Sequence, residues 1–216
     1  MNFRINLLAI IAIAATLAPK ANAGEIAQIS PKVVVYSGEM FVGDADKMRK
    51  YLKANPSTGT VYLKSRGGML VVGVNLGKLF AEYPALVVAV GEGDKCISAC
   101  AFAFLGGNRQ SLKGTLAFHR AWTEDRKLGV DAVFSEGQMA GSFMLFYLMD
   151  MGYNSQLAYI IMDKTSKHKF LVFYKKEDLD HFFVSMEKST PIGDYLKPVG
   201  YSSHWLDRAI KPGSKM

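Results

Sequence analysis

The chain has 216 residues, with 26 basic and 19 acidic side chains and a formal net charge of +7. This length is ample for one domain with a real hydrophobic core. The positive charge is modest and spread along the chain, so it gives no argument for nucleic-acid binding. After the N-terminal segment, no stretch approaches the roughly 18 uninterrupted apolar residues that a membrane-spanning helix needs.

Residues 1–23 have the pattern of a secretory signal peptide. Arg4 lies in a short basic start, an apolar run follows, and an Ala-Asn-Ala sequence ending at Ala23 precedes Gly24. Cleavage there removes two basic residues and no acidic one, which lowers the net charge from +7 to +5. We therefore expect a periplasmic or secreted protein with one domain over residues 24–216. An uncleaved anchor is the alternative.

Strands and helices alternate along the first half of the chain. Residues 33–36 form a β-branched strand, and residues 44–54 form an amphipathic helix with Asp44 as its N-cap. The pattern then predicts strands at 60–64, 86–90 and 115–119, with helices at 69–83 and from Ser98 to residue 105.

The second half of the chain has weaker signals. It predicts a polar insertion at 122–130, helices at 135–151, 155–164 and 177–183, and a strand at 170–174. The βαβαβ order of the first half is typical of an α/β fold with a mostly parallel sheet and helices packed on it.

A serine and a histidine suggest nucleophilic chemistry. Ser98, in Cys-Ile-Ser-Ala-Cys, falls at a predicted strand-to-helix junction, and His119 ends the next apolar run. A serine hydroxyl needs a base within hydrogen-bond reach before it attacks a carbonyl carbon. The earlier Ser-Arg-Gly-Gly turn ending at Gly68 offers backbone N–H groups for an oxyanion. Taken alone, a serine in this position is more often a helix N-cap than a nucleophile.

The two cysteines of the chain, Cys96 and Cys100, flank Ser98. In an oxidising compartment such a pair tends to form a disulfide, which would clamp the turn around Ser98. Two reduced, buried thiols are the alternative. A zinc site is disfavoured because no second Cys or His pair has the required spacing.

These motifs, taken together and in this order, resemble the Clp protease proteolytic subunit. They are most similar to secreted Clp-like proteins of Gram-negative bacteria. The resemblance implies a crotonase-like fold with repeated ββα-type units and a serine hydrolase activity, most simply that of an endopeptidase. By position, Ser98 would be the nucleophile and His119 the base. The oxyanion and substrate-binding backbone would be that of Gly67, Gly68 and Ala99.

The sequence departs from the family pattern at three points. Arg66 stands where the family has proline, and the interval between Ser98 and His119 is a few residues short. The non-acidic His168 stands near the expected aspartate, so Asp163 is the nearest candidate for the third triad residue.

The resemblance also implies partners. We expect a peptide or protein substrate and a homo-oligomer. We expect no ATPase partner, cofactor, metal or nucleic acid, since the chain has no nucleotide-binding motif and no His-Glu-x-x-His. One alternative is a non-catalytic binding or scaffold protein. Another is an α/β-hydrolase esterase with His181 or His204 as base. A crotonase acting on a coenzyme A thioester fits poorly with an export signal.

Overall fold

The computed structural model describes residues 24–122, 129–184 and 208–212. The predicted signal peptide lies outside these ranges. The helices are α1 (Asp44–Ala54), α2 (Leu70–Ala81), α3 (Ala99–Leu105), α4 (Val130–Asp150), α5 (Ser155–Lys164) and α6 (Lys176–Asp180).

The described strands form two sheets. The order in the larger sheet is β1 (Glu25–Ser30), β2 (Val33–Ser37), β3 (Thr60–Lys64), β4 (Val87–Val90) and β6 (Arg109–Leu112). The order in the smaller sheet is β5 (Lys95–Ile97), β7 (Thr115–Phe118), β8 (Lys169–Phe173) and β9 (Ile210–Pro212).

The predicted α/β fold with a mostly parallel sheet is confirmed. Strands β2, β3, β4 and β6 run parallel, and β1 is an antiparallel edge strand. The smaller sheet is mixed, because β8 and β9 join the parallel β5–β7 pair in antiparallel fashion. The sequence pattern did not predict β1, β5, β6 or β9, which lack a sustained apolar alternation.

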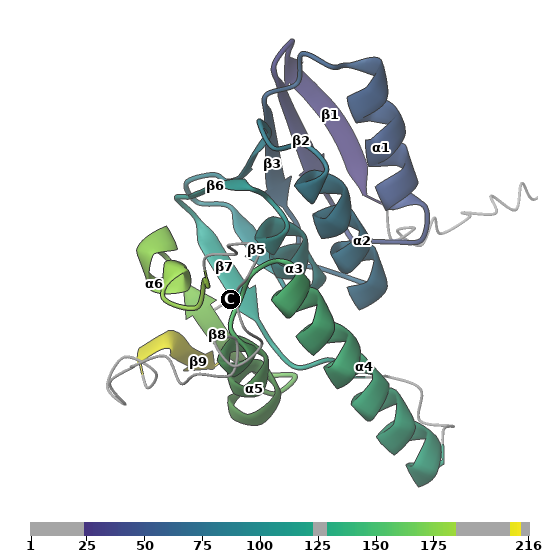
Figure 1. Ribbon diagram of the computed structural model, residues 1–216, viewed down its shortest axis with the longest axis vertical. Coiled ribbons are helices and arrows are strands. Elements are labelled where there is room, and N and C mark those ends of the chain that lie inside the picture. The colour runs from purple at the N-terminus through teal and green to yellow at the C-terminus, as the bar shows by residue number, and fades with distance from the viewer. Residues whose placement is uncertain (1–23, 123–128, 185–207, 213–216) are drawn as a thin grey trace, which may run out of the picture.

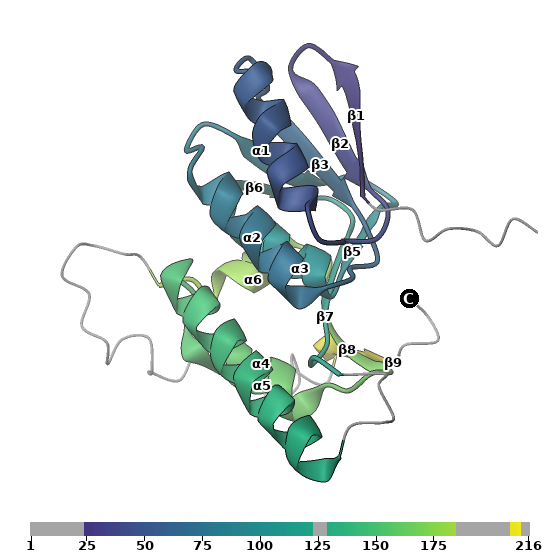
Figure 2. The ribbon, with the colours of Figure 1, turned by 90° about the vertical axis from the view of Figure 1, so that its right-hand side faces the viewer.

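The helices lie in two groups (Figures 1 and 2). Helices α1 and α2 lie over one face of the larger sheet, and α4 and α5 lie together beside the smaller sheet. Helix α3 packs against α2 and contacts both sheets, at β3 of the larger one and at β5 and β7 of the smaller one. The N-terminal half of α4 extends away from the body and exposes large apolar side chains, among them Val130 and Phe134. None of the helices in the described ranges is long and apolar enough to cross a membrane.

A row of buried aromatic rings joins the two groups of elements. Phe102 of α3 meets Phe118 of β7 edge to face, with ring centroids 5.4 Å apart. Phe118 in turn meets Phe173 of β8 at 6.0 Å, and Phe173 meets Phe182 at 6.1 Å. Such contacts add stability beyond simple burial. Because Phe102 follows Ser98 by one helical turn and Phe118 precedes His119, the first contact sets the spacing of these two residues.

Glycines let α2 and α3 pack backbone against backbone. A Cβ on Gly73 of α2 would lie 2.1 Å from the carbonyl oxygen of Ala99. A Cβ on Gly106, just after α3, would lie 2.0 Å from the carbonyl oxygen of Gly77. The neighbouring atoms are backbone and have little room to shift, so only glycine allows this approach. The start of α3 is therefore held against the first turns of α2.

We predict that Gly73→Ala lowers the free energy of unfolding by about 1–3 kcal/mol, the usual cost of overpacking. Gly137→Ala on α4 is the matched control, because a Cβ at Gly137 meets nothing within 4 Å. There the better helix propensity of alanine should raise stability by about 0.5–1 kcal/mol. Urea unfolding measures both changes, and a Gly73→Ala protein as stable as the wild type would contradict the packing argument.

Candidate active site

Ser98 joins β5 to α3 in a backbone conformation that side-chain-bearing residues rarely adopt. Its φ is 58° and its ψ is −124°, and it is the only non-glycine residue with positive φ in the described part of the chain. Such a conformation costs about 1–3 kcal/mol. The Ser98 hydroxyl makes no capping hydrogen bond to α3. The simple N-cap role is therefore not what this serine performs here.

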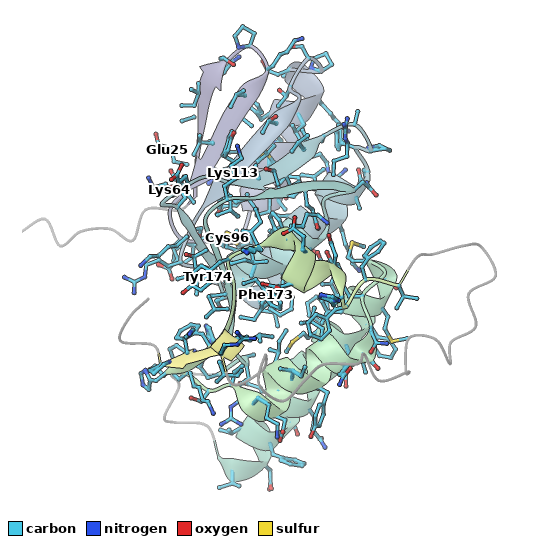
Figure 3. All side chains as sticks on the ribbon, turned by 90° about the vertical axis from the view of Figure 1, so that its left-hand side faces the viewer. Glu25, Lys64, Cys96, Lys113, Phe173 and Tyr174 are labelled. Atoms are coloured by element: carbon cyan, nitrogen blue, oxygen red, sulfur yellow. A yellow bond between two sulfur atoms is a disulfide. The ribbon has the colours of Figure 1, made fainter. Side chains whose placement is uncertain are left out.

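The backbone around Ser98 is fixed on both sides. The Ser98 N–H donates to the carbonyl of Ala117 on β7 at 2.8 Å, and the Ser98 carbonyl accepts from Ala101 N–H at 2.9 Å. The sulfurs of Cys96 and Cys100 lie at the 2.01 Å distance of a disulfide, with Cα atoms 5.1 Å apart. Cys96 is fully buried and lies level with Phe173 of β8, with Leu116 of β7 between them (Figure 3). The predicted pairing thus links the strand before Ser98 to the helix after it.

The Ser-Arg-Gly-Gly turn lies directly against Ser98. A Cβ on Gly67 would come within 2.8 Å of the Ser98 Cβ. The buried Ser65 holds this turn, because its Oγ accepts from Gly67 N–H at 3.0 Å. The Gly67 carbonyl accepts from Met40 N–H at 2.7 Å. Gly67 therefore lets the turn approach Ser98 closely, but its N–H group is already bonded to Ser65 and is not free to bind an oxyanion.

Two backbone donors near Ser98 remain open. Within the described residues, neither Gly68 N–H nor Ala99 N–H makes a hydrogen bond. Ala99 is the first residue of α3, where the amides have no intrahelical acceptor and the helix dipole favours negative charge. These are the two N–H groups that the resemblance assigns to the oxyanion.

His119 follows β7 and is half-buried, with its ring edge to face on Phe170. Its Nδ1 lies 2.9 Å from the carbonyl oxygen of Arg120. A carbonyl only accepts, so Nδ1 must carry the proton and Nε2 keeps its lone pair. Burial lowers the pKa of His119 below its ordinary 6.5, against the opposing effect of that hydrogen bond. The imidazole is thus neutral at pH 7 and in the tautomer that a general base requires.

A buried threonine fixes the backbone that orients His119. The Arg120 N–H donates to Thr165 Oγ1 at 2.8 Å, and Thr165 Oγ1 donates to the carbonyl of Ile161 on α5. Thr165 is only 3% exposed. This positioning residue belongs to no motif, and its hydroxyl meets Arg120 only in the folded chain, so no sequence pattern indicates its role.

Asp163, the predicted third triad residue, lies on α5 with a half-exposed side chain. Its carboxylate pairs with Lys164 Nζ at 2.6 Å, and this hydrogen bond is the main cause of its lowered pKa. The structure gives His119 Nδ1 a backbone carbonyl as partner instead. A role for Asp163 stays a prediction that would require the Lys164 pair to open.

Ser98 and His119 line the same cavity, which has a volume of about 440 Å³. Arg66 and Glu39 line this cavity and also a neighbouring one of about 490 Å³. Arg66 was expected near this site from the turn motif, whereas no sequence motif indicated Glu39 or Trp122. The other residues lining the first cavity are Gly68, Met69, Leu70, Phe102, Ala121, Trp122 and Met144.

The esterase alternative gains no support from this arrangement. His181 does not line the cavity that holds Ser98, and His204 lies outside the described residues. Within the described ranges, no group of three His, Cys, Asp or Glu side chains is placed to hold a metal ion.

We predict that Ser98→Gly is more stable than Ser98→Ala by about 1 kcal/mol, because glycine adopts the positive φ without strain. The same pair of substitutions at the exposed Ser142 of α4 should give the reverse order, since alanine is the better helix former. Urea unfolding of all four variants tests this. Equal stabilities of the two Ser98 variants would show that the backbone there is not strained.

We also predict that Thr165→Val loosens the orientation of His119. The substitution removes the acceptor of Arg120 N–H and should lower the free energy of unfolding by about 1–3 kcal/mol. Nitrogen-15 NMR of the imidazole should change from the Nδ1–H tautomer to a mixture, which a purely structural loss would not produce. Thr165→Ser keeps the hydroxyl and should keep the tautomer. An unchanged tautomer in a folded Thr165→Val protein would contradict this role.

Comparison with known proteins places the fold. No protein-family model matches the chain, and no curated protein matches its sequence. Among solved structures, an asparagine-to-aspartate mutant of ClpP1 from Listeria monocytogenes is 17% identical, with a TM-score of 0.53, and the match covers 71% of this chain and 89% of that chain. A second structure of ClpP1 from the same organism is 16% identical, with a TM-score of 0.51 over the same shares of the two chains. These similarities show that the chain has an α/β fold similar to that of the Clp protease subunit ClpP1.

Proposed function

We propose that this chain is an exported serine hydrolase, and that its reaction is the cleavage of peptide bonds. One observation carries the proposal. Ser98, in its strained turn, and a neutral, correctly tautomeric His119 face one cavity, beside the unbonded N–H groups of Gly68 and Ala99. The Clp-protease-like fold supports a peptidase in particular, as an argument by analogy.

The proposed mechanism assigns one task to each group. His119 Nε2 takes the proton from Ser98 Oγ as Oγ attacks the scissile carbonyl carbon. The negative charge that develops on the carbonyl oxygen is received by the N–H groups of Gly68 and Ala99. The imidazolium then gives its proton to the leaving amine as the C–N bond breaks. Water, activated by His119 in the same way, hydrolyses the acyl-enzyme.

The Arg120 carbonyl takes the place that a carboxylate has in a triad. It keeps His119 in the required tautomer, but it carries no full charge to stabilise the imidazolium that forms. A dyad of this kind should therefore work more slowly than a complete triad. No cofactor or metal enters the proposed steps.

Location and assembly are further parts of the proposal. The N-terminal leader pattern favours export to the periplasm or secretion, without an ATPase partner. Assembly into a homo-oligomer is favoured by the exposed apolar side chains of α4, since such patches mark interaction surfaces. The substrate is a peptide or an unfolded protein segment able to enter the open cavity.

A non-catalytic binding or scaffold protein is the second candidate. It is favoured by the absence of a carboxylate bonded to His119 within the described residues, and by Arg66 beside the turn. Catalytic hydrogen bonds are often long in an enzyme without substrate and tighten only when substrate binds, so the reactivity of Ser98 distinguishes the two candidates.

Fluorophosphonate labelling, followed by intact mass, tests the proposal. Ser98 Oγ should displace fluoride from the probe and give one adduct per chain. The adduct should be absent in Ser98→Ala and at least about 100-fold slower to form in His119→Ala, as expected for loss of a general base. Ser142→Ala, an exposed serine on α4, is the matched control and should label like the wild type.

The pH dependence of labelling follows from the lowered pKa of His119. The neutral imidazole is the active form, so the rate should fall as pH decreases through the His119 pKa, with a midpoint below pH 6.5. Absence of any adduct on a cooperatively folding protein would reject the hydrolase and favour the scaffold.

A further inference from the structure

The fully buried carboxylate of Asp44 gathers four donors at the start of α1. Its Oδ2 accepts from the hydroxyl of Tyr36 at 2.8 Å, from Phe41 N–H at 2.9 Å and from Gly24 N–H at 3.1 Å. Its Oδ1 pairs with Lys47 Nζ at 2.9 Å. Asp44 was predicted as an N-cap, but Gly43 holds that position and Asp44 is the first helical residue. Its side chain turns away from the helix amides and binds the start of β1 instead.

The position of Gly24 admits no side chain. A Cβ there would lie 2.0 Å from the Tyr36 hydroxyl oxygen and 2.2 Å from its Cζ. Gly24 is itself buried, and its backbone nitrogen lies against the hydrogen-bonded pair of Tyr36 and Asp44. Two features of the structure therefore concern the same residue: its Cα has no room for a side chain, and its nitrogen donates to a buried carboxylate.

This nitrogen is also the atom that the leader pattern marks for release. Hydrolysis of the Ala23–Gly24 peptide bond by a leader peptidase adds water across it, leaving a carboxyl group on Ala23 and an ammonium group on Gly24. We propose that the Gly24 ammonium created by leader removal docks on the buried Asp44 carboxylate and forms an internal ion pair that the precursor lacks. The proposal rests on the proposed leader cleavage and is independent of the hydrolase chemistry.

The charges around Asp44 favour the replacement of the neutral Gly24 amide by an ammonium group. Burial raises the pKa of Asp44, but the hydrogen bonds from Lys47, Phe41, Tyr36 and Gly24 outweigh it and keep the group ionised. Lys47 is half-exposed, so one side of the carboxylate is paired to a cation that water screens. The ammonium would replace a neutral amide donor on the other side, and charge-assisted hydrogen bonds are roughly twice as strong as neutral ones.

The proposed Gly24–Asp44 ion pair lies close to the Ser-Arg-Gly-Gly turn, residues 65–68. Glu25, next to Gly24, is level with Ser37 and, one strand further, with Lys64 at the end of β3, as the labels in Figure 3 show. Asp44 accepts from Phe41 N–H, and the preceding residue Met40 is bonded on both sides to the turn. The Met40 N–H donates to the Gly67 carbonyl, and the Met40 carbonyl accepts from Met69 N–H. Docking of the new terminus would therefore anchor the segment that braces this turn.

The test uses the full chain, expressed with its leader in a Gram-negative bacterium and purified after processing. Intact mass should show Gly24 as the first residue. The protein is labelled uniformly with nitrogen-15 and carbon-13, and the unmodified Gly24 α-amino group is then titrated by NMR through its own nitrogen and Cα chemical shifts. An ordinary α-amino group has a pKa of about 7.7–8.0, and pairing with Asp44 should raise it above about 9 despite the neighbouring Lys47 and Tyr36. The melting temperature should stay constant below pH 8 and decrease as the pH rises through the raised pKa of the Gly24 α-amino group.

A serine inserted between Ala23 and Gly24 is the matched control. Its processed chain has the same charge, but its ammonium lies one residue away from Asp44, so the α-amino pKa should be ordinary. Asp44→Asn should also restore the ordinary value, and the insertion decides the question if that variant does not fold. An N-terminus other than Gly24, or an ordinary pKa in the processed wild type, would overturn the proposal. A protein that fails to react with fluorophosphonate but shows the raised pKa would overturn only the proposed function.

Discussion

The arrangement of the candidate site depends on the backbone of Ser98, which is held at a positive φ between a strand and a helix. In a common backbone conformation this serine would be more stable by about 1–3 kcal/mol. It does not relax because both flanks are fixed. Pairing of β5 with β7 and the Ser98–Ala117 hydrogen bond fix the preceding strand. Burial of α3 and the Cys96–Cys100 link fix the helix that follows. Ser98 is thereby held at the wall of the cavity, and its hydroxyl makes no capping bond to α3.

The positions of the other site residues follow from packing around that turn. The glycines of α2 let this helix approach α3 at backbone contact, which fixes the position of α3 between the two sheets. Ser65 bridges the sheets, since its carbonyl accepts from Ile97 N–H and its N–H donates to the Lys95 carbonyl. The Phe102–Phe118 contact then fixes His119 relative to Ser98. Interiors are close-packed, so small shifts at any of these contacts are transmitted to the cavity.

The electrostatics of the site differ from those of a full triad. A backbone carbonyl orients His119, and a hydrogen bond from Thr165 fixes the residue that supplies it. This combination selects the tautomer without adding a buried charge, which would require its own stabilising partners. It also leaves the His119 pKa governed mainly by burial, and hence lowered. The expected consequence is a base that is available at neutral pH but weakly supported when it becomes a cation.

Much of the fold and part of the site could be predicted from the sequence alone. The β-branched strands, the helix over residues 44–54 and the apolar run before Ser98 have periodicities that local sequence dictates. The motifs around Ser98, His119 and the paired cysteines are contiguous, so their order along the chain was enough to suggest a fold and a chemistry.

The tertiary structure decided what depends on residues distant in sequence. The strands β1, β5, β6 and β9 form because neighbouring strands pair with them, and local sequence does not indicate which strands will pair. The orienting partner of His119 is a carbonyl held by Thr165, 45 residues away. Asp44 binds Gly24, 20 residues earlier, rather than capping its own helix. Local sequence determined which groups are present, whereas burial and the hydrogen bonds available after folding determined which of them meet.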